Sequence, residues 1–231
     1  MPNESKTPVK PKKKRPLGYN FWYDMVKVGS ALPTLLWMRP KIYYPKGKPN
    51  KKSAFVVISN HPTFLDPIIV QTVFPWRRLH SLATKDLFNS KAKETFFTKV
   101  HCIVVDKENF NMSSFRKVVE ALEMGEAVVI FPEGRVHVDT PQEVLAFKSG
   151  AVMMAHRAGA PIIPMYIVKK TKWYQRQRVV MGQALDVPGL LGRFPSVEQL
   201  NAVSDLLREK EVELREYFES LPVYEKMKNQ K

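Results

Sequence analysis

The stretch VVISNHPTFLDP, residues 56–67, ends an apolar run at Asn60 and His61 and brings a carboxylate, Asp66, five residues after the histidine. The run before Asn60 is rich in β-branched residues, as is typical of a buried strand. Asp66 and Pro67 indicate a helix start, with the proline at the first helical position and the aspartate as its cap. A turn between His61 and Asp66 would instead bring the carboxylate to the imidazole. Such a carboxylate holds the ring in one tautomer and stabilises its protonated form, so the stretch allows either a cap or a catalytic pair.

Short apolar runs of strand character alternate with helical stretches after residue 52. The runs lie at residues 54–59, 79–83, 101–105, 127–131, 161–168 and 178–182. Helices are expected at residues 113–125, at residues 149–159, and from Ser196 onward, where Ser196 and Gln199 have the spacing of a capping box. Strands that alternate with helices indicate an α/β domain built on a central sheet.

Composition and charge limit the classes of protein to which this chain can belong. A chain of 231 residues with 44% hydrophobic content is long enough for one sizeable domain with a buried core. A single cysteine, Cys102, excludes a disulfide framework and a cysteine-rich metal site. The formal charge of +15 predicts an anionic partner, and nucleic acid, a membrane surface and a phosphorylated substrate all qualify.

The first residues differ from the rest of the chain. Residues 1–16 are basic and rich in proline, which predicts a disordered tail that is simply solvated or held near a membrane, and KKKR at 12–15 leaves a nuclear signal as a weaker third alternative. Residues 17–38 are apolar and aromatic, but Asp24, Lys27 and Pro33 interrupt them, and no uncharged run reaches the ~20 residues needed to cross a bilayer.

We expect this segment to form a pair of helices that lies in the membrane interface, with Trp22, Tyr23 and Trp37 at the headgroups. Packing of the segment on the domain is the alternative. No secretory signal is recognisable, so the sequence predicts a protein that faces the cytosol. The predicted organisation is therefore a tail at residues 1–16, a membrane-associating helical segment at residues 17–44 and a catalytic domain at residues 45–231.

The sequence lacks the usual motifs of nucleotide-binding loops, zinc proteases and serine hydrolases. Three polar stretches interrupt the apolar runs instead: NHPTFLD at 60–66, FPEGRVH at 131–137 and FKSGA at 147–151. Each follows a predicted strand or opens a predicted helix, where loops present side chains on a rigid scaffold. These stretches are therefore the candidates for a functional site.

Their order and content resemble the lysophosphatidate acyltransferases, also called 1-acylglycerol-3-phosphate acyltransferases. The N-H-x-x-x-x-D block of that family is met by Asn60, His61 and Asp66, and its F-P-E-G block by residues 131–134. Between them, HCIVVDK at 101–107 is similar to the family's G-x-I-F-I-D-R block. A further apolar-Pro-apolar block is met at residues 163–165, and the likeness covers roughly residues 54–185.

Two departures from the family pattern concern the phosphate-binding positions. In the block at residues 101–107, His101 stands where the family has glycine and Lys107 where it has arginine. After Gly134, Arg135 follows directly, without the Ser or Thr that the family places before its arginine.

The resemblance implies a fold and an activity. The fold would be the glycerolipid acyltransferase fold, a central mixed sheet flanked by helices, preceded by an interfacial helical segment. The enzyme would move a fatty acyl group from an acyl thioester, carried by acyl-carrier protein or coenzyme A, to the free sn-2 hydroxyl of lysophosphatidate. His61 would act as general base with Asp66 orienting its ring. The expected substrate-binding residues are Asn60, Lys107, Glu133, Gly134, Arg135 and Lys148.

The same resemblance predicts no metal and no cofactor beyond the acyl thioester as co-substrate. The expected partners are a lysophospholipid, the acyl thioester and an anionic membrane surface on the cytoplasmic side, where the protein would be peripheral or monotopic, and acyl-carrier protein is a candidate donor partner. No nucleic acid is expected. Other lysophospholipid acyltransferases and tafazzin-like transacylases share the two main blocks, so the acceptor headgroup stays open. A non-catalytic basic protein that binds membranes or nucleic acid is the alternative from a different class.

Overall fold

The computed structural model describes residues 20–50, 53–105, 112–133, 147–170, 172 and 174–228. Within them a seven-stranded sheet has the strand order β1-β7-β6-β2-β5-β3-β4. Its strands are β1 (Lys41–Tyr43), β2 (Phe55–Ser59), β3 (Leu79–Thr84), β4 (Ile103–Val105), β5 (Ala127–Ile130), β6 (Ile162–Val168) and β7 (Arg178–Met181). The helices are α1 (Phe21–Met38), α2 (Asp66–Val73), α3 (Lys91–Lys99), α4 (Met112–Glu123), α5 (Gly150–Ala158), α6 (Val187–Leu190), α7 (Val197–Glu219) and α8 (Pro222–Lys228), with a 3-10 turn at Lys85–Phe88.

The sheet is mixed, as expected. All neighbouring strands run parallel except β6 and β7, which form an antiparallel pair. The six runs predicted as strands all form strands, with ends within two residues of the prediction. Strand β1 was not predicted: Lys41 to Tyr43 pair with β7 at the sheet edge, inside the segment that we expected to be helical.

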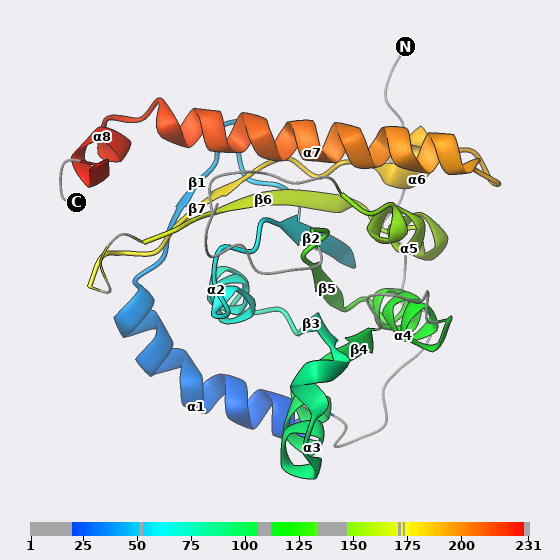
Figure 1. The fold of residues 1–231 in the computed structure, drawn as a ribbon, viewed down its shortest axis with the longest axis horizontal. Helices are drawn as coiled ribbons and strands as arrows, with labels where there is room; N and C mark the ends of the chain where they lie inside the picture. Colours follow the sequence, from blue (N-terminus) through cyan, green and yellow to red (C-terminus); the bar gives the residue numbers. More distant parts are fainter. Residues whose placement is uncertain are drawn as a thin grey trace.

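Helices cover both faces of the sheet (Figure 1). Along β2 the side chains alternate, as they must in a strand. Val56 and Ile58 pack in the core formed with α4, α5 and α7. Phe55 and Val57 pack in the core formed with α2 on the other face. Because both faces are covered, all five residues of β2 are buried, and only the ends of the strand can meet a substrate.

Helix α1 is one continuous helix rather than the predicted pair of helices. It lies along the side of the molecule opposite α7 (Figure 1), and Pro33 is accommodated inside it. Tyr23 is 5% exposed, and its hydroxyl accepts the backbone N–H of Leu79 at 2.8 Å and donates to Gln71. The expectation that Tyr23 inserts in a membrane is therefore wrong, because this residue anchors α1 to the domain.

The outer face of α1 carries an apolar stripe. Phe21, Met25, Val28, Leu32 and Leu36 recur every three or four residues, and each is 47–73% exposed. We call these five residues the α1 stripe. Of the described helices, none combines the length and apolar content needed to cross a bilayer.

Candidate active site

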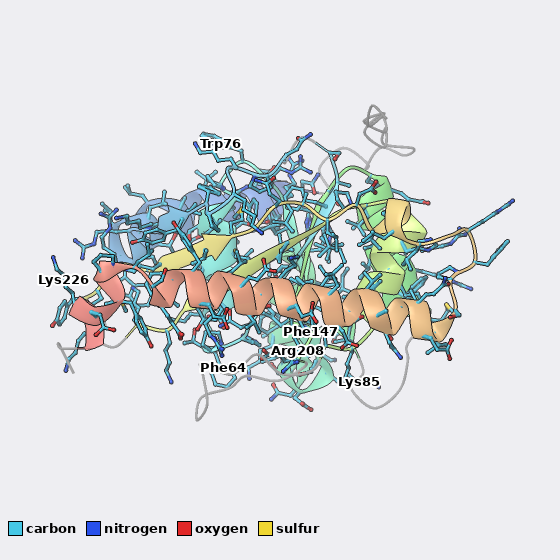
Figure 2. The ribbon with its side chains drawn as sticks, turned by 90° about the horizontal axis from the view of Figure 1, so that it is seen from above. Phe64, Trp76, Lys85, Phe147, Arg208 and Lys226 are labelled. Carbon is cyan, nitrogen blue, oxygen red and sulfur yellow. The ribbon has the colours of Figure 1, made fainter. Side chains whose placement is uncertain are left out.

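The site forms where neighbouring strands end. Strands β2 and β5 are parallel and paired, so the loops that follow them leave the same edge of the sheet. Asn60 and His61 follow β2, and Phe131 to Glu133 follow β5. Figure 2 shows Phe64 and Phe147, which belong to two of the three polar stretches, on one side of the molecule and Trp76 on the other. The carboxyl edge of a parallel sheet is the usual place for a ligand, and here it gathers the predicted blocks.

His61 and Asp66 form a close pair. The distance from His61 Nδ1 to Asp66 Oδ2 is 2.7 Å, and the Asp66 side chain is completely buried. Asp66 also accepts the backbone N–H of Thr63 at 2.8 Å and its hydroxyl at 2.7 Å. The aspartate thus stabilises the turn before α2 and orients the histidine at the same time. The cap predicted for Asp66 is not formed, because Asp66 is the first residue of α2, Leu65 is its N-cap residue and no side chain caps the helix, so the structure realises the pairing with His61.

The imidazole of His61 is fixed on a second side by an aromatic ring. It stacks on Phe131 with ring centroids 4.1 Å apart and planes inclined by 16°. Its side chain is 16% exposed, and Nε2 has no hydrogen-bond partner among the described residues. With Nδ1 engaged by Asp66 and one face covered by Phe131, Nε2 is the ring atom available to a substrate.

Asn60 has a structural role in addition to its place in the block. Its side chain is buried, donating Nδ2–H to the carbonyl of Ile167 at 3.0 Å and accepting the backbone N–H of Ile167 at 2.7 Å. The amide side chain therefore continues the pairing of β2 with β6 by one position beyond the end of β2. Asn60 positions His61, and its amide group is already used by the backbone, which differs from the substrate contact that we expected.

The other predicted binding residues are only partly described. Glu133 is 9% exposed at the end of β5, and the backbone N–H of Lys148 donates to the carbonyl of Pro132 at 3.4 Å. The side chain of Lys148 is exposed beside this loop. The structure thus brings Lys148 to the F-P-E-G block. Lys107, Gly134 and Arg135 lie outside the described residues, and their roles stay predictions.

One residue near the site was missed by the sequence analysis. Glu211 on α7 is completely buried. Burial raises the pKa of its carboxyl well above the usual value, and the nearby Glu133 raises it further, while the backbone N–H of Asn60 opposes the shift. Helix α7 therefore places a buried carboxyl with a raised pKa behind the loop that carries His61. The available signal was a glutamate in the apolar stripe of α7, four residues after Leu207 and three before Leu214.

The departure at His101 has a structural explanation. Its φ is +62°, a left-handed conformation that glycine adopts without steric cost and that other residues rarely adopt. The ring of His101 stacks between Tyr23, at 4.5 Å, and His80, at 4.8 Å. His80 is in turn 2.7 Å from Glu126. These contacts join α1 to the sheet, so the histidine adds packing that a glycine would lack.

Several known proteins that are similar to this chain are acyltransferases. The family model described as Acyltransferase matches residues 40–168. A 1-acyl-sn-glycerol-3-phosphate acyltransferase of Bacillus subtilis (strain 168) is 30% identical over 205 residues, which are 83% of this chain and 97% of that protein. A probable 1-acyl-sn-glycerol-3-phosphate acyltransferase of Mycoplasma pneumoniae is 29% identical over 137 residues, which are 55% of this chain and 48% of that protein.

The fold has a counterpart among solved structures. The 1-acyl-sn-glycerophosphate (LPA) acyltransferase PlsC from Thermotoga maritima is similar with a TM-score of 0.59 and 19% sequence identity, over 85% of this chain and 81% of that chain. The likeness at this identity concerns the fold. Together with the matched family model and the Bacillus subtilis relative, which is similar over nearly its whole length, it confirms the predicted resemblance. The chain belongs to the acyltransferase family.

Proposed function

We propose that this chain transfers a fatty acyl group from an acyl thioester to the free sn-2 hydroxyl of lysophosphatidate, which gives phosphatidate. The observation that carries the proposal is the 2.7 Å contact between His61 Nδ1 and Asp66 Oδ2 at the carboxyl edge of the sheet. The activity named for the Bacillus subtilis relative supports the choice of acceptor.

His61 would act as the general base. Because the Asp66 carboxylate accepts a hydrogen bond from Nδ1–H, the lone pair of the ring lies on Nε2. Nε2 takes the proton of the acceptor hydroxyl as its oxygen attacks the thioester carbonyl carbon. The C–S bond then breaks, and the departing sulfur takes the proton back from His61. A thioester is already activated, so the scheme needs no covalent enzyme intermediate and no cofactor.

The phosphate of the acceptor would be held on the β5 side of His61. Arg135 and Lys107 would hold it by charge-assisted hydrogen bonds, for which arginine offers a two-pronged donor and lysine a point charge. Glu133 and Gly134 would shape the pocket, and Lys148 offers a further cation beside it. Neutralising Arg135 or Lys107 should raise the KM for lysophosphatidate more than the KM for an acceptor without a terminal phosphate. An equal rise in KM for both acceptors would instead indicate that Lys148 binds the phosphate.

The protein would work at the cytoplasmic surface of a membrane, bound peripherally. Two features support this: the exposed α1 stripe and the basic residues 1–16. Apolar insertion and electrostatic attraction are each marginal alone and add when combined. Deleting residues 1–16 should weaken binding to anionic vesicles chiefly at low salt, where charges are screened least.

The contribution of the α1 stripe is tested by changing Met25, Val28 and Leu32 to serine. This variant should bind vesicles weakly even at high salt and keep its activity on acceptor in detergent. The variant Phe194→Ser/Val197→Ser, whose side chains are also exposed but lie near the start of α7, is the matched control. Full sedimentation of the α1 variant with vesicles would refute the role of the stripe.

The reaction itself is tested with purified protein, both acyl-carrier protein and coenzyme A thioesters, and several lysophospholipids. His61→Ala should abolish turnover with every donor while the fold and lipid binding persist, because the imidazole acts in the transition state. Near wild-type turnover by this variant would overturn the mechanism. A clear preference for another lysophospholipid would leave the role of His61 as base unchanged and replace lysophosphatidate as the proposed acceptor.

A further inference from the structure

A cavity of about 230 Å³ opens beside the catalytic loop, on the side of β6. Pro62, Thr63 and Asp66 line its end at the loop. Met38, Ile69 and Ile167 give it an apolar wall, and Lys169, Lys170 and Lys172 line the end toward the turn between β6 and β7. Small-molecule pockets usually measure about 300–1,000 Å³, so this one suits a narrow arm of a ligand rather than a whole ligand.

The strand order places this cavity on the opposite side of His61 from the proposed acceptor site. β6 and β7 neighbour β2 on one side, and β5, β3 and β4 follow on the other. Glu133 follows β5, and Lys107 and Arg135 follow β4 and β5 in the sequence. The described acceptor candidates, Glu133 and Lys148, thus lie on the β5 side. A transfer reaction needs two substrates at one base, and the β6 side offers space for the second.

The far end of the cavity is strongly cationic. The ammonium group of Lys170 lies 5.4 Å from the centre of the Trp37 ring. Burial lowers the pKa of Lys170, and the nearby Arg39 and Arg178 lower it further. Among the described residues, no acidic side chain forms an ion pair with Lys170, Arg39 or Arg178. Cations that repel one another in this way favour a bound anion, and phosphate is the anion that lysine commonly holds.

The length of the cavity favours one of the two substrates. Ile167 lies opposite Asn60, beside the base, through the two hydrogen bonds of the Asn60 amide. Lys170 follows three residues later, which is at most about 10 Å along the chain, and its long side chain extends the reach. The ligand must therefore separate its reacting group from its anionic group by a long arm. The reacting hydroxyl of lysophosphatidate is only a few bonds from its phosphate, whereas a phosphopantetheine thioester carries the two at opposite ends of a long arm.

We propose that this cavity binds the acyl donor through its phosphopantetheine arm. The arm lies against Met38, Ile69 and Ile167, its phosphate meets Lys170 and Lys172, and the thioester carbonyl emerges at Pro62 beside His61. In the transfer the C–S bond of the donor breaks, the acceptor oxygen forms the new C–O bond, and the hydroxyl proton passes through His61 to the sulfur. Coenzyme A and acyl-carrier protein share this arm, and the inference rests on the proposed function.

The test compares substrate affinities in detergent, where membrane binding does not contribute. The variant Lys170→Gln/Lys172→Gln should raise the KM for a short-chain acyl-coenzyme A about tenfold, since it removes charge-assisted contacts. Its KM for lysophosphatidate and its kcat at saturating donor should change less than about twofold. The matched control is Lys93→Gln/Lys117→Gln, which changes two exposed lysines on α3 and α4 that do not line the cavity.

Two further measurements separate the sources of the phosphate. A similar rise in the KM for acyl-phosphopantetheine would support recognition of the arm itself. A rise in KM seen only with the acyl-carrier protein thioester would refute donor binding in the cavity and assign the lysines to a protein-docking surface. A loss of vesicle binding with unchanged donor KM would assign them to the membrane and also overturn it.

The inference and the proposed function fail in different ways. Calorimetric binding of acyl-coenzyme A to the His61→Ala protein does not depend on turnover. If the lysine variant binds the donor as tightly as the control while His61→Ala is inactive, the reaction stands and the donor site is refuted. If His61→Ala turns over normally but the lysine variant loses donor affinity, the base is refuted and the donor site is supported.

Discussion

The change Asp66→Asn tests the catalytic pair most directly. Asparagine keeps the size of the side chain and one oxygen that can accept a hydrogen bond, but it carries no charge. In the wild type, the buried Asp66 lies 2.7 Å from His61 Nδ1 and also accepts two hydrogen bonds from Thr63. The substitution therefore leaves the shape of the site and removes the electrostatic support of a protonated His61.

The size of the effect follows from the geometry. A 2.7 Å contact places the charge centres of imidazolium and carboxylate about 4 Å apart, where two unit charges attract by about 4 kcal/mol at an effective dielectric constant of about 20. This attraction exists only after the ring has taken the acceptor proton, so it lowers the barrier rather than the ground state. Each ~1.4 kcal/mol corresponds to a tenfold change in rate, and we expect kcat to fall about a thousandfold.

The assay is steady-state turnover with saturating donor and acceptor in detergent. Folding is checked by thermal unfolding, because loss of the charge-assisted bonds from Thr63 should cost about 1–3 kcal/mol, and a chain of this size loses about 2–4 °C of Tm per kcal/mol. Asp205→Asn, an exposed change on α7, is the control and should leave kcat unaltered. A folded Asp66→Asn protein whose kcat stays within about tenfold of wild type would refute the electrostatic argument.

Three further outcomes are expected. The folded chain holds the Glu211 proton more tightly than the unfolded chain, so the folded state becomes less stable as the pH rises above the ordinary carboxyl pKa of 4.5. The Tm of Glu211→Gln should therefore fall less than the Tm of wild type between about pH 5 and about pH 8. Asn60→Ala leaves two backbone groups of Ile167 unpaired, which should cost about 2–5 kcal/mol in denaturant unfolding and lower kcat with little change in acceptor KM; a rise in acceptor KM alone would restore Asn60 as a substrate contact. Tyr23→Phe should lower Tm because the buried N–H of Leu79 loses its acceptor, and an unchanged Tm would show that α1 is held by other contacts.

Much of the fold could be predicted because its strands and helices follow from patterns of residues that are close together in the sequence. The six predicted strands are apolar runs between turn residues, and the periodic apolar positions of α4 and the capping box of α7 are visible within a few residues. The edge strand β1 was missed since three residues with mixed burial show no such pattern. It becomes a strand only because the exposed edge of β7 offers it backbone partners.

The contact between His61 and Asp66 could also be predicted from the sequence, since the two residues are five positions apart and Pro67 marks the helix start that brings them together. The contacts that support this pair could not. Asn60 bonds Ile167, which is 107 positions away in the chain. No local rule names such a partner, because it depends on which strands become neighbours in the sheet.

The sequence alone determined the class of fold, the order of the motifs and the candidate base, because strand and helix periodicity and a short turn depend on residues close together in the chain. Only the tertiary structure decided that Tyr23 is buried against His101, that Glu211 lies behind the His61 loop near Glu133, and that Lys170 lies over Trp37 at the end of a cavity. The physical reason is that burial and charge proximity are properties of residues brought together from distant parts of the chain by packing. From the sequence alone, Lys170 and Glu211 would be interpreted as solvated surface residues, because their neighbours in space are not known.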